Sequence, residues 1–284
     1  MTVVRPHVVP FFHRRSGTLS YLVHHGKDAL IIDPVIDYDP VSGQLCSGPS
    51  DEIAAAAERL DVNVHWVIDT HAHADHLSGA YYLKTRFEAK LGMGRGIQNV
   101  HATFAAVFND QTEQAVPFDA FFEDGTGFFA GDLDVQVMAT PGHTDDSVTY
   151  LIGDAAFVGD TLFAPERGTA RCDFPGGSAD ALFDTIQSLY DLPDGTRLFL
   201  CHDYPEHDAD PVVYTTVEAQ RTGNARVRRD TDRTSFVAWR EARDAALSLP
   251  ALIIPALQVN VRGGALPAAE SNGIRYLKVP LNQF

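Results

Sequence analysis

Cysteine is scarce in this chain. Among 284 residues there are three, Cys46, Cys172 and Cys201, at irregular spacings. An odd and low count excludes a scaffold held by disulfides and favours a reducing compartment. The first residues also lack the basic and then apolar layout of a signal peptide, because His7 and His13 interrupt the apolar positions. We therefore expect a cytoplasmic protein.

Positive charge is scarce as well. Lys and Arg number 22 against 38 Asp and Glu, which gives a formal net charge of -16. Such a charge opposes binding to nucleic acid and to anionic lipid, and no apolar run approaches the roughly 20 residues of a membrane span. We therefore expect no nucleic-acid partner and no membrane partner. An arginine close to an active site would be informative, because an anionic substrate needs local positive charge.

The stretch that carries most chemistry is residues 70–76, Thr-His-Ala-His-Ala-Asp-His. It follows an apolar run, residues 64–68, that is typical of a buried strand, and it precedes a segment, residues 77–83, that is typical of the start of a helix. Histidines two positions apart on a helix would face different sides. A loop at the end of a strand can instead direct its side chains at one point. The pattern predicts a metal site with four candidate ligands: His71, His73, Asp75 and His76.

Three later strand ends add side chains of the same type. His143 follows a strand predicted at 133–138, Asp160 ends one at 155–158, and His202 follows an apolar run at 198–200. An earlier strand ends at Asp33, which either forms a turn before Pro34 or supports the site. The candidate ligands then number seven: His71, His73, Asp75, His76, His143, Asp160 and His202.

Imidazole and carboxylate ligands suit Zn, Fe or Mn rather than Ca or Mg. Seven ligands can hold two metals bridged by one carboxylate, an arrangement suited to hydrolysis. They can also hold one metal through two histidines and one carboxylate, which is characteristic of non-haem Fe(II) oxygenases. The residue types leave both arrangements open.

The other elements are predicted from apolar runs and turn residues. We expect strands at 8–13, 19–24, 29–34, 91–96 and 148–152, and helices at 53–60, 97–108, 217–229 and 235–247. Residues 37–49 are predicted as a loop, the stretch from 109 to 124 as a surface segment, and residues 252–254, 257–261 and 276–280 as extended. Alternating strands and helices indicate a layered α/β fold. We expect a single domain over residues 1–284, with its core at about 8–210 and a C-terminal appendage at about 211–284.

Taken together, the motifs resemble the metallo-β-lactamase fold, an αββα sandwich. In that family histidine motifs of this kind occur in the same order, and the match covers roughly residues 8–205. Histidine rather than glutamate at position 73 is unlike the flavodiiron branch. The matching pieces are Thr70-His71-x-His73-x-Asp75-His76, Pro141-Gly142-His143-Thr144, Gly159-Asp160-Thr161 and Cys201-His202-Asp203.

Within this family the chain is most similar to the persulfide dioxygenases. The similarity depends on residues 71–80, on Arg171-Cys172-Asp173-Phe174 and on His202-Asp203-Tyr204. The Arg-x-Asp-Phe piece discriminates best between branches. The appendage, through residues 257–261 and 276–280, resembles the longer bacterial members.

The resemblance implies one Fe(II) per chain, held by His71, His143 and Asp160, with positions left for a persulfide sulfur and for O2. The other candidate ligands would orient ligands and water or form a vacant second site; these are His73, Asp75, His76 and His202. The implied reaction converts glutathione persulfide, O2 and water into glutathione and sulfite, as in sulfide detoxification. A homodimer is a further expectation from the family.

Two more residues receive roles from the resemblance. Arg171 would face the substrate, although a surface salt bridge is the plainer interpretation. Tyr204 would hydrogen-bond near the iron, and a merely packed tyrosine is the alternative. Cys172, beside Arg171, is interpreted as a small inert filler rather than a redox-sensitive neighbour.

Two other functions fit the same residues. The first is a dinuclear hydrolase of glutathione thioesters, of the glyoxalase II type, with two Zn, Fe or Mn ions. It would use all seven ligands, but the residues after His202 do not resemble the glutathione-binding helical domain of those hydrolases. The second is a non-catalytic metal-binding sensor, and seven ligand-type residues at strand ends argue against it.

Overall fold

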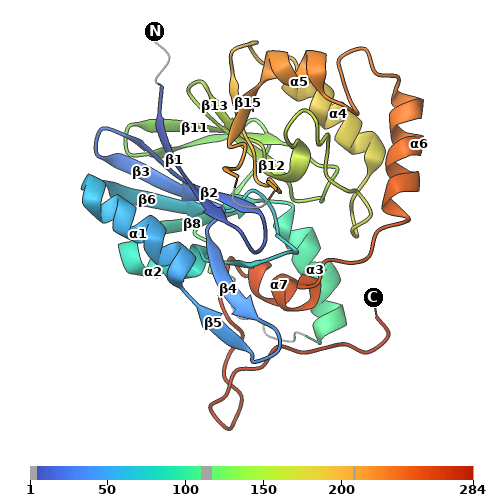
Figure 1. The fold of residues 1–284 in the computed structure, drawn as a ribbon. Coiled ribbons are helices and arrows are strands. Elements are labelled where there is room, and N and C mark those ends of the chain that lie inside the picture. Colours follow the sequence, from blue (N-terminus) through green and yellow to red (C-terminus); the bar gives the residue numbers. More distant parts are fainter. Residues whose placement is uncertain (1–4, 110–116, 207–208, 284) are drawn as a thin grey trace.

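Two six-stranded sheets pack against each other and carry helices on their outer faces (Figure 1). The computed structural model describes residues 5–109, 117–206 and 209–283. In the first sheet β1, β2 and β3 are antiparallel neighbours, whereas β3, β6, β8 and β9 run parallel. Its strands, in spatial order, are β1 (His7–His13), β2 (Thr18–His25), β3 (Asp28–Ile32), β6 (Asn63–Ile68), β8 (Lys90–Gly94) and β9 (Ala120–Phe122).

The second sheet gathers three strand ends at one edge. β11 and β12 are antiparallel, β12 and β13 are antiparallel, and β13 and β14 are parallel. Because the direction reverses twice, β11, β13 and β14 point the same way and their carboxyl ends lie together. The strands are β10 (Gly127–Ala130), β11 (Leu133–Ala139), β12 (Val148–Ile152), β13 (Ala155–Phe157), β14 (Arg197–Phe199) and β15 (Tyr214–Thr216).

Alternation along the strands fills the space between the sheets. In β11, Leu133 and Val135 are buried whereas Asp134 is exposed, as expected for a strand with one face in the core. Across the core the Tyr21 ring of β2 meets the Phe157 ring of β13 edge-on, with centroids 5.2 Å apart. Full burial of one such side chain contributes about 2 to 3 kcal/mol. This contact joins the two sheets close to the ends that carry the candidate ligands.

Helices cover both outer faces. α1 (Gly48–Leu60) and α2 (Ala80–Phe87) pack on the first sheet through Ile53 and Leu83. α4 (Ala179–Leu189) begins at Ser178, whose side chain accepts from the Ala181 amide, and packs with α6 (Arg233–Asp244) beside the second sheet (Figure 1). The predicted αββα sandwich is confirmed. The remaining elements are β4 (Val35–Asp39), β5 (Gln44–Cys46), β7 (Leu77–Ser78), α3 (Ile97–Phe108), the 3-10 helix η1 (Gly159–Thr161), α5 (Val217–Gly223) and α7 (Ile253–Asn260).

The predicted loop at 37–49 is wrong over most of its length, because β4, β5 and the first residues of α1 occupy it. β4 and β5 pair there as an antiparallel hairpin. The Asp39 carboxylate accepts from the Val41 amide at 2.9 Å and from the Ser42 hydroxyl at 2.7 Å, and Gly43 has a φ of 71°. The polar and glycine residues that indicated a loop are therefore the turn of a hairpin.

The predicted extended segments at 252–254 and 257–261 are also wrong. They form α7 and its C-cap, Val261. Ile253, Leu257 and Val261 are four positions apart and join one apolar cluster with Phe104 and Phe108. β-branched residues favour strands in general. Here the apolar residues recur every four positions, so a helix brings them onto one face, which packs against α3. Residues 276–280 form no strand.

Other elements differ in their bounds. α5 ends at Gly223 rather than at 229, and residues 77–78 form the short strand β7 before α2 begins. The predicted surface segment at 109–124 contains β9, and its residues 110–116 lie outside the described residues. We made no prediction for α4. No helix in the described part of the chain is both long and apolar enough to cross a membrane.

Candidate metal centre

The structure brings all seven candidate ligands to one edge of the sandwich. The loop after β6 carries four of them, and the segments after β11, β13 and β14 carry the others. A backbone hydrogen bond of 2.9 Å from the Val148 amide to the Thr70 carbonyl ties this loop to the second sheet. The five histidines of the set are all buried: His71, His73, His76, His143 and His202.

His71, His143 and Asp160 form one compact group. Their possible ligand atoms all lie within 4.8 Å of one another. The Asp160 Oδ2 atom is 3.6 Å from Nε2 of His143 and 4.0 Å from Nε2 of His71. One ion could therefore contact all three side chains.

In His71 and in His143 the hydrogen bond engages the Nδ1 atom, and the Nε2 atom is directed at Asp160. The Thr70 hydroxyl donates to Oδ2 of Asp33 at 3.0 Å, so it accepts from His71 Nδ1 at 3.0 Å. His143 Nδ1 donates to the Arg171 carbonyl at 2.7 Å. In each ring the Nε2 lone pair then faces Asp160. Metal-binding histidines are oriented by a second hydrogen bond of this kind.

His73 is held in a related way. Its Nε2 donates to Oδ1 of Asp33 at 3.0 Å, and its buried Nδ1 has no hydrogen-bond partner in the described structure. Burial lowers the pKa of His71 and of His73 well below the ordinary value, and the neighbouring histidine adds to the effect in each case. Both imidazoles are therefore neutral, which is the form that binds a metal.

A second group surrounds Asp75. Its Oδ1 lies 3.3 Å from Nδ1 of His76, and its Oδ2 lies 3.6 Å from Nε2 of His202. Burial opposes ionisation of Asp75, but the attraction of His202 and His76 outweighs it and holds the pKa of the carboxyl well below its usual range. His202 Nε2 is also 3.4 Å from Oδ1 of Asp160. Asp160 thus stands between the two groups, with one oxygen toward each.

The donor set fits a metal ion. Four buried atoms of the candidate ligands have no hydrogen-bond partner among the described residues: His73 Nδ1, His76 Nε2, Asp160 Oδ1 and His202 Nδ1. Each buried polar atom left unsatisfied costs about 1 to 3 kcal/mol, and coordination to a metal ion would remove this cost for the atoms that it contacts. Nitrogen and carboxylate donors together suit Zn, Fe or Mn.

A cleft of about 550 Å³ opens above this centre. Arg171 lines it, and its guanidinium is paired with the Asp173 carboxylate at 2.6 Å and lies over the Phe174 ring. Tyr204 also lines it, 55% exposed, with its ring stacked parallel to that of His202 at 5.9 Å. Cys172 is buried, and burial raises the pKa of its thiol to about 12, so it is held as a neutral thiol.

Two features of the site were not predicted. Asn260 of α7 hydrogen-bonds to the loop that carries four candidate ligands, although it lies within a segment predicted as extended. Three arginines of the C-terminal part line the cleft: Arg226, Arg240 and Arg243. No local sequence signal marks these residues, because their positions depend on how the appendage folds back.

Comparison with known proteins agrees with the geometry. The model of the metallo-beta-lactamase superfamily matches residues 13–202. A beta-lactamase hydrolase-like protein of Xylella fastidiosa is 47% identical over 98% of this chain, which spans 65% of that protein's length. Glyoxylase B2 of Dictyostelium discoideum is 39% identical, with 97% of this chain and 96% of the relative covered.

Persulfide dioxygenases are also among the relatives. The human mitochondrial persulfide dioxygenase ETHE1 is 30% identical over 76% of this chain and 74% of its own length. The crystal structure of ETHE1 from Myxococcus xanthus aligns with a TM-score of 0.73 at 29% identity, and covers 91% of this chain and all of that one. The chain belongs to the metallo-β-lactamase superfamily and is related to the persulfide dioxygenases.

Proposed function

We propose that this protein is an Fe(II)-dependent persulfide dioxygenase. The reaction is glutathione persulfide plus O2 plus water giving glutathione, sulfite and two protons. The terminal sulfur rises from oxidation state 0 to +4, and its four electrons reduce O2. One bound Fe(II), held by His71, His143 and Asp160, would supply coordination positions for the substrate sulfur and for O2.

The observation that carries the proposal is the place of the Arg171–Phe174 segment. His143 donates to the Arg171 carbonyl, and the Phe174 ring stands edge-on to the His143 imidazole with centroids 5.3 Å apart. The motif that most resembles the persulfide dioxygenases therefore forms the wall around one proposed ligand. The relationship to human ETHE1 and to the Myxococcus structure supports the same assignment.

The other residues of the cleft have separate roles in this proposal. Arg171, pinned by Asp173, supplies positive charge near an anionic substrate. Tyr204 is partly exposed in the cleft and can offer its hydroxyl to the substrate. The remaining candidate ligands would position the water that the reaction consumes: His73, Asp75, His76 and His202. A cytoplasmic location and a homodimer stay predictions.

A dinuclear hydrolase of glutathione thioesters is the second candidate. The observation in its favour is that Asp160 directs one oxygen to each of the two groups of histidines, as a bridging carboxylate would. The Dictyostelium relative is named Glyoxylase B2. Two bound Zn, Fe or Mn ions would supply an activated water for attack on a thioester.

Metal content and substrate choice together separate these candidates. We expect protein loaded with Fe(II) to hold one iron per chain, to take up O2 when glutathione persulfide is added, and to leave S-lactoylglutathione intact. Two metals per chain with hydrolysis of S-lactoylglutathione would favour the second candidate. Metal binding without either reaction would favour a non-catalytic sensor.

A further inference from the structure

Asp146 lies in the segment between β11 and β12 that also carries the candidate ligand His143. Its side chain is buried, and its Oδ2 atom accepts a hydrogen bond of 2.7 Å from the backbone amide of Ala72, 74 residues earlier in the chain. Ala72 stands between His71 and His73. One carboxyl group therefore joins two segments that each carry candidate ligands.

Burial of the Asp146 carboxyl group is unfavourable on its own. Its Oδ1 atom is also buried and has no hydrogen-bond partner in the described structure. Such an atom is destabilising, and the large majority of buried side-chain polar atoms in folded proteins are paired. Exceptions to rules of this kind occur mainly at functional or strained sites. The contact with the Ala72 amide is therefore made at a cost in stability, as expected of a residue that serves the site.

Two glycines at the end of β8 allow Asp146 to approach the first sheet. A Cβ atom at Gly96 would lie 2.6 Å from the Cα atom of Asp146, and one at Gly94 would lie 2.8 Å from its carbonyl oxygen. A side chain at either position would therefore displace the Asp146 backbone. Glycine permits this kind of close approach between backbones, which here brings the Asp146 side chain within reach of Ala72.

A second hydrogen bond joins the same two segments. The Val148 amide donates to the Thr70 carbonyl at 2.9 Å. Both peptide groups that flank His71 are thus held by the segment that follows His143. The rings of His71 and His143 stand nearly perpendicular, with centroids 5.1 Å apart, and both belong to the first group of candidate ligands.

We propose that Asp146 is a positioning residue that sets the separation of His71 and His143 before the metal ion binds. Asp146 does not line the cleft and belongs to no group of described residues that could hold a metal ion, so it acts through the Ala72 backbone. Residues that orient metal ligands commonly change metal affinity tenfold or more when they are replaced. The inference rests on the metal centre of the proposed function and holds for either candidate reaction.

Co(II) binding to the metal-free protein tests this role without turnover. Co(II) is the probe because its visible absorption spectrum depends on the number and arrangement of its ligands. Asp146→Ala is expected to weaken Co(II) binding about tenfold or more and to alter the spectrum. Asp146→Asn keeps a side-chain oxygen that can accept from the Ala72 amide. It is expected to restore the wild-type spectrum and an affinity within about threefold of the wild type.

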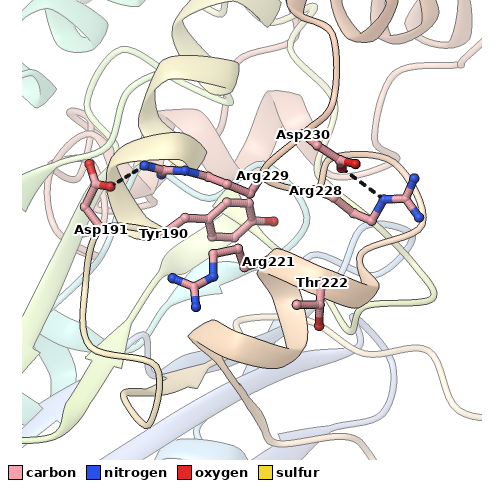
Figure 2. Close-up of a pocket in the computed structure, with 7 residues that line it drawn as sticks. All are labelled: Tyr190, Asp191, Arg221, Thr222, Arg228, Arg229 and Asp230. Carbon is pink, nitrogen blue, oxygen red and sulfur yellow. Dashed lines mark hydrogen bonds and ion pairs between the residues drawn. The ribbon is translucent and has the colours of Figure 1, made fainter.

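Two controls separate positioning from a general loss of stability. Asp145→Asn changes the neighbouring exposed carboxylate, which accepts from Asn99 at 2.9 Å, and is expected to bind Co(II) like the wild type. Tyr190→Phe removes a buried hydroxyl that donates to the Val227 carbonyl at 2.6 Å. Tyr190 lines a pocket that shares no lining residue with the cleft over the metal centre (Figure 2). Tyr190→Phe is expected to lower the free energy of unfolding and to leave Co(II) affinity and the spectrum unchanged.

A change at the other partner tests the same hydrogen bond. Incorporation of lactic acid in place of Ala72 turns the backbone amide into an ester, which removes the donor and keeps every side chain. This ester variant is expected to bind Co(II) as weakly as Asp146→Ala. It takes the place of Asp146→Ala if that protein does not fold.

The inference is overturned if folded Asp146→Ala or the ester variant binds Co(II) with wild-type affinity and spectrum. It is also overturned if Asp146→Asn binds Co(II) as weakly as Asp146→Ala, since the acceptor oxygen would then not matter. None of these results depends on O2 uptake. A protein that behaves as expected in these titrations and consumes no O2 would contradict the proposed dioxygenase and leave the role of Asp146 intact.

Discussion

The side-chain amide of Asn260 donates a hydrogen bond of 2.8 Å to the backbone carbonyl of His76, 184 residues earlier in the chain. It donates another of 2.8 Å to the carbonyl of His73, and its oxygen accepts from the Ser78 amide at 2.7 Å. Asn260 is buried at the end of α7. One carboxamide from the appendage thus fixes the backbone of the loop that carries four candidate ligands.

Asn260→Ala should lower both stability and metal affinity. The change leaves two buried carbonyls and one amide without partners, which predicts a loss of about 2 kcal/mol or more in the free energy of unfolding. Looser positioning of His73 and His76 should weaken metal binding about tenfold or more. Chemical denaturation and a competitive chelator titration measure the two effects. Asn260→Asp, which keeps the acceptor but loses both donors, is the matched variant. Wild-type metal affinity in both variants would show that the contact does not position the loop.

Asp160→Ala should abolish iron binding. Asp160 supplies the carboxylate of the group that it forms with His71 and His143, and without it two imidazoles remain in that group. Elemental analysis after Fe(II) loading gives the occupancy, and circular dichroism shows whether the fold is kept. A folded Asp160→Ala protein with one iron per chain would place the metal elsewhere.

Arg171→Ala should retain iron and raise KM. The hydrogen bond from His143 goes to the Arg171 backbone carbonyl, which alanine preserves, whereas the guanidinium lost from the cleft is the group proposed to attract the substrate. Steady-state O2 uptake gives kcat and KM separately. Asp173→Asn, which removes the partner of Arg171 but not its charge, is the control. If kcat and KM of Arg171→Ala equal those of the wild type, Arg171 does not contribute to substrate binding.

The metal-free protein should lose stability on acidification. Burial lowers the pKa of His71 and of His73, so the unfolded chain takes up protons that the folded chain does not. Stability therefore falls as the pH drops below about 6.5, the ordinary value for histidine. His202 acts in the opposite direction, because Asp160 and Asp75 outweigh its burial and raise its pKa.

Thermal unfolding of the metal-free protein between pH 7.5 and pH 5.5 measures this dependence. The variant His73→Asn replaces the imidazole with a polar carboxamide, which does not titrate, and so removes one titrating group. It should show a shallower decline than the wild type. An equal slope in both proteins would mean that His73 does not contribute to the pH dependence.

The alternating elements are sufficient to predict a layered α/β fold and the seven candidate ligands, whereas the two-sheet αββα arrangement follows from the resemblance to the family. Four of those ligands are neighbours in one loop, and His143, Asp160 and His202 each follow a strand, so a local pattern locates them. Their convergence follows from the shared direction of β11, β13 and β14.

The sequence does not predict what the appendage contributes. The apolar, β-branched residues of α7 favour a strand locally, and only packing on α3 makes them helical. The local sequence therefore indicates that Asn260 belongs to a strand. Only the fold shows that its side chain hydrogen-bonds to the loop of candidate ligands. Arg226 and Arg243 look like ordinary solvated charges in the sequence for the same reason, because only the fold of the appendage brings them to the cleft.

O2 uptake by the Fe(II)-loaded protein on addition of glutathione persulfide tests the central claim most directly. The account predicts rapid uptake, with one sulfite and one glutathione formed for each O2 consumed. A folded sample with one iron per chain that consumes no O2 would contradict it, and S-lactoylglutathione would then be the next substrate to test.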